Sequence, residues 1–259
     1  MRICVAQTDI VWEDKAANML RYESFFSEAA SGGAELLVFP EMSLTGFSMD
    51  TSLAESFDGQ TCAYFTEMAI RYKIAVVYGY VERIDDKFFN RLSAIRSDGV
   101  VIDRYSKMHP FNPGGESIFT GGNVAESFSL NGVRFGLTIC YDLRFPELYR
   151  YLSKNCDCVI VSASWPGSRR EHWMTLLKAR AIENQCYIAG CNRTGHGGGI
   201  DYSGDSMVIA PDGTVISLAD AGKAQLIYAD ISADTVNDLR RSFPVLNDMR
   251  PDIYRNFYE

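Results

Sequence analysis

The sequence predicts an α/β fold built on a mixed β-sheet. Strand-like apolar runs alternate with segments of helical spacing over residues 2–72 and again from residue 125 onward. Between these regions, three strand-like runs follow one another without a helix, and the Ser97-Asp98-Gly99 junction has the residue types of a tight hairpin. Alternating elements favour parallel strands and hairpins require antiparallel ones, so the sheet is expected to contain both.

The elements of the first half follow in order. Residues 2–10 predict a strand, and residues 18–30 carry apolar side chains at helical spacing. Residues 34–40, AELLVFP, predict a short buried strand, and a second helix is expected around residues 62–72. The three consecutive strand-like runs are then IAVVYGYVE, FFNRLSAIRSDG and VVIDRYSK.

The second half returns to alternation. ESFSLNGVRFGLTI predicts strand structure, followed by a helix from Pro146, the strand CDCVIVSAS, the long helix EHWMTLLKARAIENQ and the strand CYIAGCN. A final hairpin turns at Asp212-Gly213, and AQLIYADI precedes the helix DTVNDLRRSF. No linker, repeat or low-complexity tract interrupts the chain, so we expect a single domain over residues 1–259.

Composition excludes several classes of protein. The chain has 259 residues, 47% of them hydrophobic and 22% charged, with a net charge of −8, which is typical of a globular protein with a sizeable core. Basic residues form no run that could follow a phosphate backbone, so nucleic acid is not an expected partner. No signal-like segment or membrane-length apolar run is present, which predicts a cytoplasmic enzyme or binding protein.

Seven cysteines are present, an odd number without zinc-site spacing. Cys156 and Cys158 are two apart, which on a strand places both on one face as core residues. Cys4, Cys62, Cys186 and Cys191 are likewise expected to be buried apolar fillers.

Cys140 is different, because an apolar run stops there and turns polar, in LTICYDLRFPEL. Other apolar runs end similarly, before Glu41, Lys107 and Trp165. Ligand clefts of α/β sheets lie beyond the carboxyl ends of the strands, so these endings are expected to converge on one edge.

The residue types at these endings suit nucleophilic catalysis. An ordinary thiol is only a few per cent thiolate at neutral pH and needs a base or a nearby cation. Histidine is the usual base, but none of the three histidines has a position that motivates it. Glu41 follows the apolar VFP, where burial would raise its pKa and make it a base. Lys107 and the backbone N–H of Tyr141 could then stabilise an oxyanion.

Three motifs in this order, FPEMSLTGF, YSKMHPF and CYDLRFPEL, resemble the Glu-Lys-Cys triad of the nitrilase superfamily of carbon–nitrogen hydrolases. NRLSAI, HWMTLLKARAIENQ, YIAGCNRTG and RPDIY extend the resemblance over nearly the whole chain. The resemblance implies a four-layer αββα sandwich of two mixed β-sheets flanked by helices. It also implies a homodimer or larger homo-oligomer, and chemistry that needs no metal or organic cofactor.

Carried over residue by residue, the resemblance makes Glu41 the general base, Lys107 the oxyanion stabiliser and Cys140 the nucleophile that forms a thioester with loss of ammonia. Glu116 in NPGGESIF matches a second family glutamate, which would position Lys107 or assist the base. Asp142, Arg144 and Glu147 are interpreted as charges that pin the turn after the strand.

The segments around the triad look most similar to the bacterial ω-amidase-like branch, whose members hydrolyse the terminal amide of 2-oxo acids such as 2-oxoglutaramate and 2-oxosuccinamate. Such a substrate needs a cation at the distal end of its pocket. Arg169 is the candidate, with Arg170 in reserve, and Phe47, Trp165 and Tyr141 are expected to wall the pocket.

Several interpretations stay open at this point. An N-carbamoyl amino acid hydrolase or another small-amide hydrolase of the same superfamily fits the triad equally, and a catalytically silent binding module is the alternative outside enzymes. His109 is a candidate for orienting the lysine loop, and His172 for packing at the start of a helix. The glycines at 197–199 predict a flexible loop near the mouth of the site.

Overall fold

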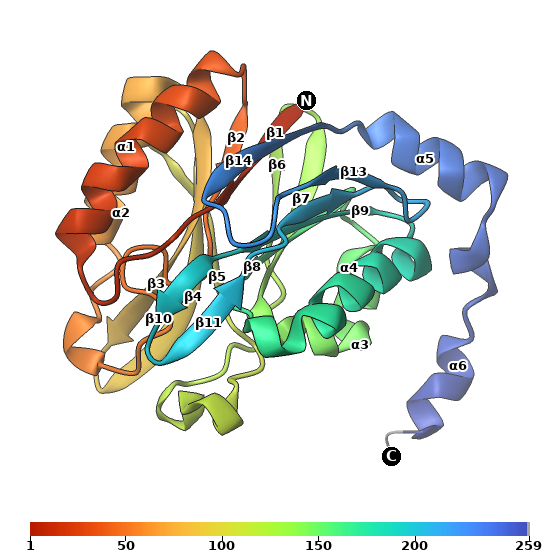
Figure 1. Cartoon of the computed structure of the whole chain (residues 1–259). Coiled ribbons are helices and arrows are strands. Elements are labelled where there is room, and N and C mark those ends of the chain that lie inside the picture. Colours follow the sequence, from red (N-terminus) through yellow and green to blue (C-terminus); the bar gives the residue numbers. More distant parts are fainter. Residues whose placement is uncertain (258–259) are drawn as a thin grey trace.

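The computed structural model describes residues 1–257, whose core is two facing six-stranded β-sheets (Figure 1). The first sheet has the strand order β14-β1-β2-β3-β4-β5. Strands β1, β2 and β3 are parallel, while β14, β4 and β5 join through antiparallel pairs, so the sheet is mixed as expected. Its strands are β1 (Arg2–Gln7), β2 (Leu36–Val38), β3 (Ala75–Ile84), β4 (Lys87–Ile95), β5 (Val101–Ser106) and β14 (Gln225–Asp230).

The second sheet has the strand order β13-β12-β9-β8-β7-β6. Its central strands β7, β8 and β9 are parallel, and hairpin partners close both edges. Its strands are β6 (Ser127–Leu130), β7 (Val133–Ile139), β8 (Cys158–Ala163), β9 (Tyr187–Asn192), β12 (Met207–Ile209) and β13 (Val215–Leu218).

Helices cover the outer face of each sheet, which confirms the four-layer sandwich (Figure 1). Helices α1 and α2 lie on the first sheet, and α3 and α4 lie on the second. The bounds are α1 (Lys15–Ser31), α2 (Gln60–Tyr72), α3 (Pro146–Leu152), α4 (Arg170–Asn184), α5 (Ala233–Ser242) and α6 (Pro251–Tyr254). No helix among the described residues is long and apolar enough to cross a membrane.

Alternation along β1 shows how a strand serves two layers. Ile3 and Val5 belong to the core cluster between the sheets, whereas Cys4 and Ala6 belong to the cluster under α1 and α2. Successive strand side chains point to opposite faces, so a strand buried on both sides becomes apolar throughout. This explains why the short runs of the sequence read as continuous hydrophobic stretches.

Two expectations need correction. Residues 197–199 were expected as a flexible loop, but they belong to a small hairpin of β10 (Thr194–Gly197) and β11 (Ile200–Ser203). Gly198 and Gly199 have positive φ angles and form its turn, a conformation that glycine adopts without strain. Cys62 was expected to be buried, but it lies on α2 and is partly exposed.

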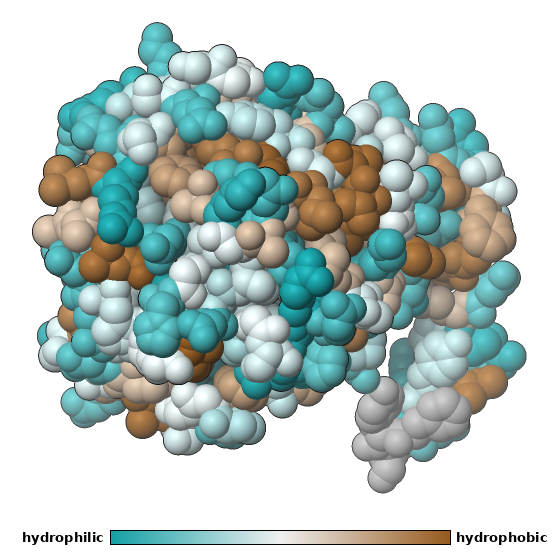
Figure 2. Space-filling view, in the orientation of Figure 1, coloured by the Kyte–Doolittle hydropathy of each residue, from teal (hydrophilic) through white to brown (hydrophobic). Residues whose placement is uncertain are grey.

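The outer surface on the side shown in Figure 2 mixes polar and apolar residues. Hydrophobic residues gather in its upper middle part, over β13 and β14 in the view of Figure 1. Ile216 and Leu218 of β13 are among the exposed large hydrophobic residues. Beyond α5, the chain runs away from the two sheets and carries α6 to the side of the body (Figure 1).

Gly79 in β3 allows a close approach between this strand and the segment after β2. A Cβ atom at residue 79 would lie 2.5 Å from the backbone nitrogen of Met42 and 3.0 Å from Cα of Glu41. The Oγ of Ser43 accepts the Gly79 N–H at 2.9 Å, and the Ser43 N–H donates to the Gly79 carbonyl at 2.9 Å. Glycine at this strand position therefore lets residues 41–43 lie directly against β3.

We expect Gly79→Ala to lower the free energy of unfolding by about 1–3 kcal/mol, because the added methyl group meets backbone atoms that cannot rotate away. Urea unfolding of the variant beside the parent chain measures the change. Gly167→Ala is the control, since its nearest neighbour would be the Asp201 carbonyl oxygen at 3.3 Å. Equal stability of Gly79→Ala and the parent chain would contradict the close approach.

Candidate active site

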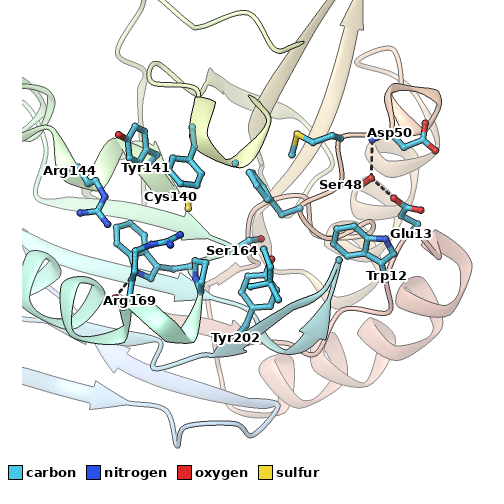
Figure 3. A pocket seen from close by; sticks show the side chains of 18 residues that line it. Trp12, Glu13, Ser48, Asp50, Cys140, Tyr141, Arg144, Ser164, Arg169 and Tyr202 are labelled. Atoms are coloured by element: carbon cyan, nitrogen blue, oxygen red, sulfur yellow. Dashed lines mark hydrogen bonds between the residues drawn. The ribbon is translucent and has the colours of Figure 1, made fainter. Parts of the chain in front are cut away.

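A cavity of about 430 Å³ opens beyond the carboxyl ends of β7 and β8. Cys140, which directly follows β7, and Ser164 and Trp165, which follow β8, line it. The sequence predicted that several apolar runs end at one edge of the fold. The residues that follow β7 and β8 line the same cavity, as that prediction requires. Figure 3 shows the cavity with the labelled side chains around it.

Cys140 lies at a sharp turn directly after β7, where it is the first residue of the short 3-10 helix η4 (Cys140–Arg144). Its φ angle is 45°, a left-handed conformation that is uncommon for a residue with a side chain. Asp142 holds the turn: its carboxylate accepts hydrogen bonds from the Ile139 N–H at 3.0 Å and the Tyr105 hydroxyl at 2.7 Å. Strain at Cys140 is thus supported by buried hydrogen bonds, a common arrangement at functional sites.

Two further side chains fix the same turn. Arg180 of α4 donates from Nε and Nη2 to the Leu143 carbonyl oxygen at 3.1 and 2.8 Å. His109 donates its backbone N–H to Asp142 at 3.0 Å, and its Nδ1 lies 2.8 Å from the same oxygen. The loop that carries Lys107 is therefore tied to the turn that carries Cys140, in agreement with an orienting role for His109.

Beneath the cavity, one ammonium group lies between two carboxylates. Lys107 Nζ is 2.8 Å from Glu41 Oε1 and 2.6 Å from Glu116 Oε2. The three side chains are at most 1% exposed. Glu41 follows β2, Lys107 follows β5, and Glu116 begins the short 3-10 helix η3 (Glu116–Ile118), so three separate segments assemble this cluster.

Every oxygen of the two carboxylates has a partner. The Asn90 side-chain amide donates to Glu41 at 2.7 Å and to Glu116 at 2.8 Å. The backbone N–H of Ser164 donates to Glu41 Oε2 at 2.9 Å, and the backbone N–H of Phe111 donates to Glu116 at 2.6 Å. Because buried charges are tolerated only when paired and hydrogen-bonded, this network keeps the cluster stable and fixed in place.

The cluster shifts the protonation equilibria at the site. Burial raises the pKa of Glu41, and the nearby Lys107 charge offsets part of that rise. Burial also raises the pKa of Cys140 well above the usual thiol value; Glu41 raises it further and Lys107 lowers it. Although burial disfavours the charged amine, the carboxylates of Glu41 and Glu116 raise the pKa of Lys107. At neutral pH the Cys140 thiol is therefore protonated. The raised pKa of Glu41 makes this carboxylate a better proton acceptor than an ordinary glutamate.

The residues predicted for substrate contact all line the cavity: Phe47, Tyr141, Trp165 and Arg169. Arg169 places its guanidinium 5.5 Å from the centre of the Phe111 ring. Arg170 does not line the cavity, because its guanidinium is bound to both oxygens of Asp205 at 2.9 and 2.8 Å. The reserve assignment of substrate binding to Arg170 was therefore wrong.

Arg144 is a cavity residue that the sequence did not identify as one. The pattern grouped it with the charges that pin the turn, whereas the structure places it on the cavity wall. Its guanidinium lies 4.8 Å from the centre of the Trp165 ring and 5.9 Å from that of Tyr141. One Arg144 nitrogen is 3.3 Å from Nδ1 of His172, which is exposed and not buried in packing. The position of Arg144 only four residues after Cys140 was the feature of the sequence that could have indicated its place in the cavity.

Charges are distributed unevenly around the cavity. In Figure 3, Arg144 and Arg169 lie to one side of Cys140, and Glu13, Ser48 and Asp50 lie to the other. The Glu13 carboxylate accepts a hydrogen bond from the Ser48 hydroxyl. An anionic group in the cavity is therefore attracted to the arginine side. Among residues 1–257, no group of three or more His, Cys, Asp and Glu side chains is arranged to hold a metal ion.

Comparison with known proteins identifies the family of the chain. The carbon–nitrogen hydrolase family profile matches residues 2–241. The 2-oxoglutaramate amidase of Bacillus subtilis is 34% identical over 97% of this chain and 98% of its own length. Omega-amidase YafV of Escherichia coli is 34% identical over 96% of both chains. The crystal structure of XC1258 from Xanthomonas campestris, described as a CN-hydrolase superfamily protein with an arsenic adduct in the active site, has a TM-score of 0.91, 33% identity and coverage of 96% and 97%.

The chain belongs to the carbon–nitrogen hydrolase family of the nitrilase superfamily. Its relatives over nearly full length include bacterial ω-amidases. The protein is thus an enzyme that hydrolyses carbon–nitrogen bonds of amides other than peptide bonds.

We expect Lys107→Met to lower the free energy of unfolding by about 3–5 kcal/mol at pH 8, because two buried carboxylates lose their cation. The loss should be smaller at pH 5. The raised pKa of Glu41 means that the folded chain binds a proton more readily than the unfolded chain, which favours folding at low pH and is lost as pH rises through the folded pKa. Removing Lys107 enlarges this effect, since that charge lowers the pKa of Glu41.

Urea unfolding at the two pH values measures the difference. Lys223→Met is the matched control, because this lysine is 69% exposed and its ion pair is with the exposed Asp220 at 2.8 Å. A loss for Lys107→Met that is the same at pH 5 and pH 8 would mean that Glu41 does not take up the proton.

Proposed function

We propose that this protein is an ω-amidase that hydrolyses the terminal carboxamide of a small 2-oxo acid, such as 2-oxosuccinamate or 2-oxoglutaramate, to the acid and ammonia. The observation that carries the proposal is one cavity that holds the Cys140 thiol together with the guanidinium groups of Arg144 and Arg169. The names of the similar bacterial proteins, 2-oxoglutaramate amidase and omega-amidase, support the same substrate class.

In the first half-reaction, Glu41 acts as general base and takes the proton of the Cys140 thiol. The sulfur attacks the amide carbon, and the carbonyl oxygen becomes an oxyanion. The Lys107 ammonium and the Tyr141 backbone N–H are the donors assigned to this oxyanion. Glu41 then gives its proton to the amide nitrogen, the carbon–nitrogen bond breaks, and ammonia leaves a thioester on Cys140.

In the second half-reaction, water replaces ammonia. Glu41 takes a proton from the water, and the oxygen attacks the thioester carbon to form a second oxyanion at the same donors. When this intermediate collapses, the carbon–sulfur bond breaks, the acid leaves, and the Cys140 sulfur recovers a proton from Glu41. Glu116 is assigned a positioning role, because its carboxylate accepts a hydrogen bond from the Lys107 ammonium at 2.6 Å.

Substrate selection follows from the uneven charge of the cavity. The distal carboxylate of a 2-oxo acid amide is an anion, and guanidinium groups bind carboxylates through charge-assisted hydrogen bonds. Arg144 and Arg169 are therefore assigned to the carboxylate, while the amide end lies at Cys140. Glu13 on the other side of Cys140 opposes binding in the reverse orientation.

An N-carbamoyl amino acid hydrolase is the second candidate, because its substrate also carries a carboxylate beside a terminal amide. The two reactions differ in their products, since only the carbamoyl substrate releases carbon dioxide with ammonia. A silent binding module is disfavoured by the fully hydrogen-bonded Glu41, Lys107 and Glu116 cluster, which a module without chemistry does not require.

We expect the chain to release ammonia from 2-oxosuccinamate and 2-oxoglutaramate faster than from glutamine, a simple aliphatic amide or an N-carbamoyl amino acid. Cys140→Ala should abolish this release, because it removes the attacking sulfur. A coupled ammonia assay measures all five substrates, with carbon dioxide followed for the carbamoyl substrate. Activity on another amide alone would overturn the substrate class, and activity that survives in Cys140→Ala would overturn the mechanism.

We expect Arg169→Ala and Arg144→Ala each to raise KM for 2-oxosuccinamate about 10- to 100-fold, the equivalent of a lost hydrogen bond to a charged group. Steady-state kinetics on both variants measure the change. Arg241→Ala is the control, since this side chain is 76% exposed and lies on α5. An unchanged KM in both cavity variants would show that the carboxylate binds elsewhere.

A further inference from the structure

Tyr202 is a cavity residue with no part in the chemistry described above. It lies on β11, in the small hairpin that the sequence did not predict, and it lines the same cavity as Cys140 and Arg169. Figure 3 shows Tyr202 on the wall of the cavity that the hairpin forms, with Tyr141 on a different wall. The residue is only 4% exposed, so its side chain is held in place by its surroundings.

The hydroxyl of Tyr202 has no hydrogen-bond partner among residues 1–257. A buried hydroxyl without a partner is destabilising, and most such groups in folded proteins have a hydrogen-bond partner. The backbone of this residue is satisfied, because β11 pairs with β10 and the Thr194 hydroxyl donates to the Tyr202 carbonyl at 3.3 Å. The unpaired group is thus the buried hydroxyl of a side chain that lines the cavity.

The ring of Tyr202 rests on a buried cation. The guanidinium carbon of Arg193 lies 4.4 Å from the ring centre, and Arg193 is fully buried. Arg193 donates to the backbone carbonyl oxygens of Ile10 and His196 at 3.1 Å, and the nearest carboxylate, Asp9, is 3.8 Å away. A cation stacked on a phenol ring draws electrons from it, so the Tyr202 hydroxyl becomes a stronger hydrogen-bond donor.

Tyr202 lines the same cavity as Cys140 and Arg169, which are assigned to the amide and the carboxylate of the substrate. Burial raises the pKa of Tyr202 to about 12, so the hydroxyl keeps its proton at neutral pH. Glu41 and Cys140 at the reacting end also influence this pKa, and so does Arg169 at the opposite end. A 2-oxo acid amide that spans these two groups has its ketone oxygen between them, inside the cavity that Tyr202 lines.

We propose that the Tyr202 hydroxyl donates a hydrogen bond to the 2-oxo oxygen of the substrate and thereby selects 2-oxo acid amides over the same chain without the oxo group. This inference rests on the proposed ω-amidase function and adds the residue that recognises the ketone. The ketone oxygen is only an acceptor, which suits a donor with no other partner.

The same arrangement disfavours a 2-amino acid amide. At neutral pH its amino group is an ammonium ion, which has only donors and carries a positive charge. In place of the ketone, this ammonium would lie in a cavity lined by Arg169 and by Tyr202, whose ring stacks on the Arg193 guanidinium. Like charges in a cavity shielded from water repel strongly, so asparagine is a poor substitute for 2-oxosuccinamate.

The test compares Tyr202→Phe with the parent chain on 2-oxosuccinamate and on succinamate, which differ only in the oxo group. The variant removes one oxygen atom and keeps the ring over Arg193. We expect kcat/KM for 2-oxosuccinamate to fall about tenfold, as for loss of one hydrogen bond. For succinamate we expect less than about a twofold change. Succinamate is also measured as a competitive inhibitor of 2-oxosuccinamate hydrolysis, so that its binding is known even when its turnover is slow.

Tyr78→Phe is the matched control, because Tyr78 is a fully buried tyrosine under α2 and does not line the cavity. Thermal unfolding of both variants verifies that they are folded. An equal loss on both substrates, or no loss on either, would overturn the role of Tyr202 and leave the proposed function intact. Failure of the parent chain to hydrolyse either substrate would overturn the proposed function and this inference together.

Discussion

The site depends on one buried ammonium group that two buried carboxylates share. Lys107 alone would be expelled from an apolar interior or would lose its proton, and without Lys107 the buried carboxylates of Glu41 and Glu116 would lack a compensating charge. Together with the Asn90 amide, which donates to both carboxylates, they form a network that is stable only when all members are present. The segments that carry these residues, after β2, within β4, after β5 and in η3, are thereby fixed relative to one another.

This network also determines the character of the thiol above it. The carboxylate and the ammonium act on Cys140 in opposite directions, and burial adds to the effect of the carboxylate. A thiol in these surroundings stays protonated, and in the proposed mechanism its proton moves to Glu41, whose own pKa is raised by burial. Such a site avoids a permanently ionised sulfur, which is the form that oxidants attack. The left-handed turn at Cys140 keeps the sulfur exposed to the cavity while the surrounding residues are buried.

Much of this architecture could be predicted from the sequence, because the information was local. Apolar runs that end abruptly at Glu41, Lys107 and Cys140 reveal both the strands and the positions after them. Arg144 was misassigned because the direction of a side chain at the end of a 3-10 turn depends on neighbours such as Trp165. Tyr202 was missed because its hairpin has only four residues in each strand and three glycines near the turn, too few for a recognisable alternation.

The reacting groups belong to different layers of the sandwich. Glu41 and Lys107 follow strands of the first sheet, whereas Cys140 follows a strand of the second. The contacts that join them cross the interface, as when the Ser164 N–H after β8 donates to Glu41 and the Ser162 hydroxyl donates to the Phe39 carbonyl at 2.9 Å. A slip of one sheet over the other by about 1 Å would separate the proposed base from the proposed nucleophile and leave each sheet intact. The turnover rate of this enzyme therefore depends strongly on the alignment of its two sheets. Spectroscopic measures of secondary structure would not detect a change in that alignment.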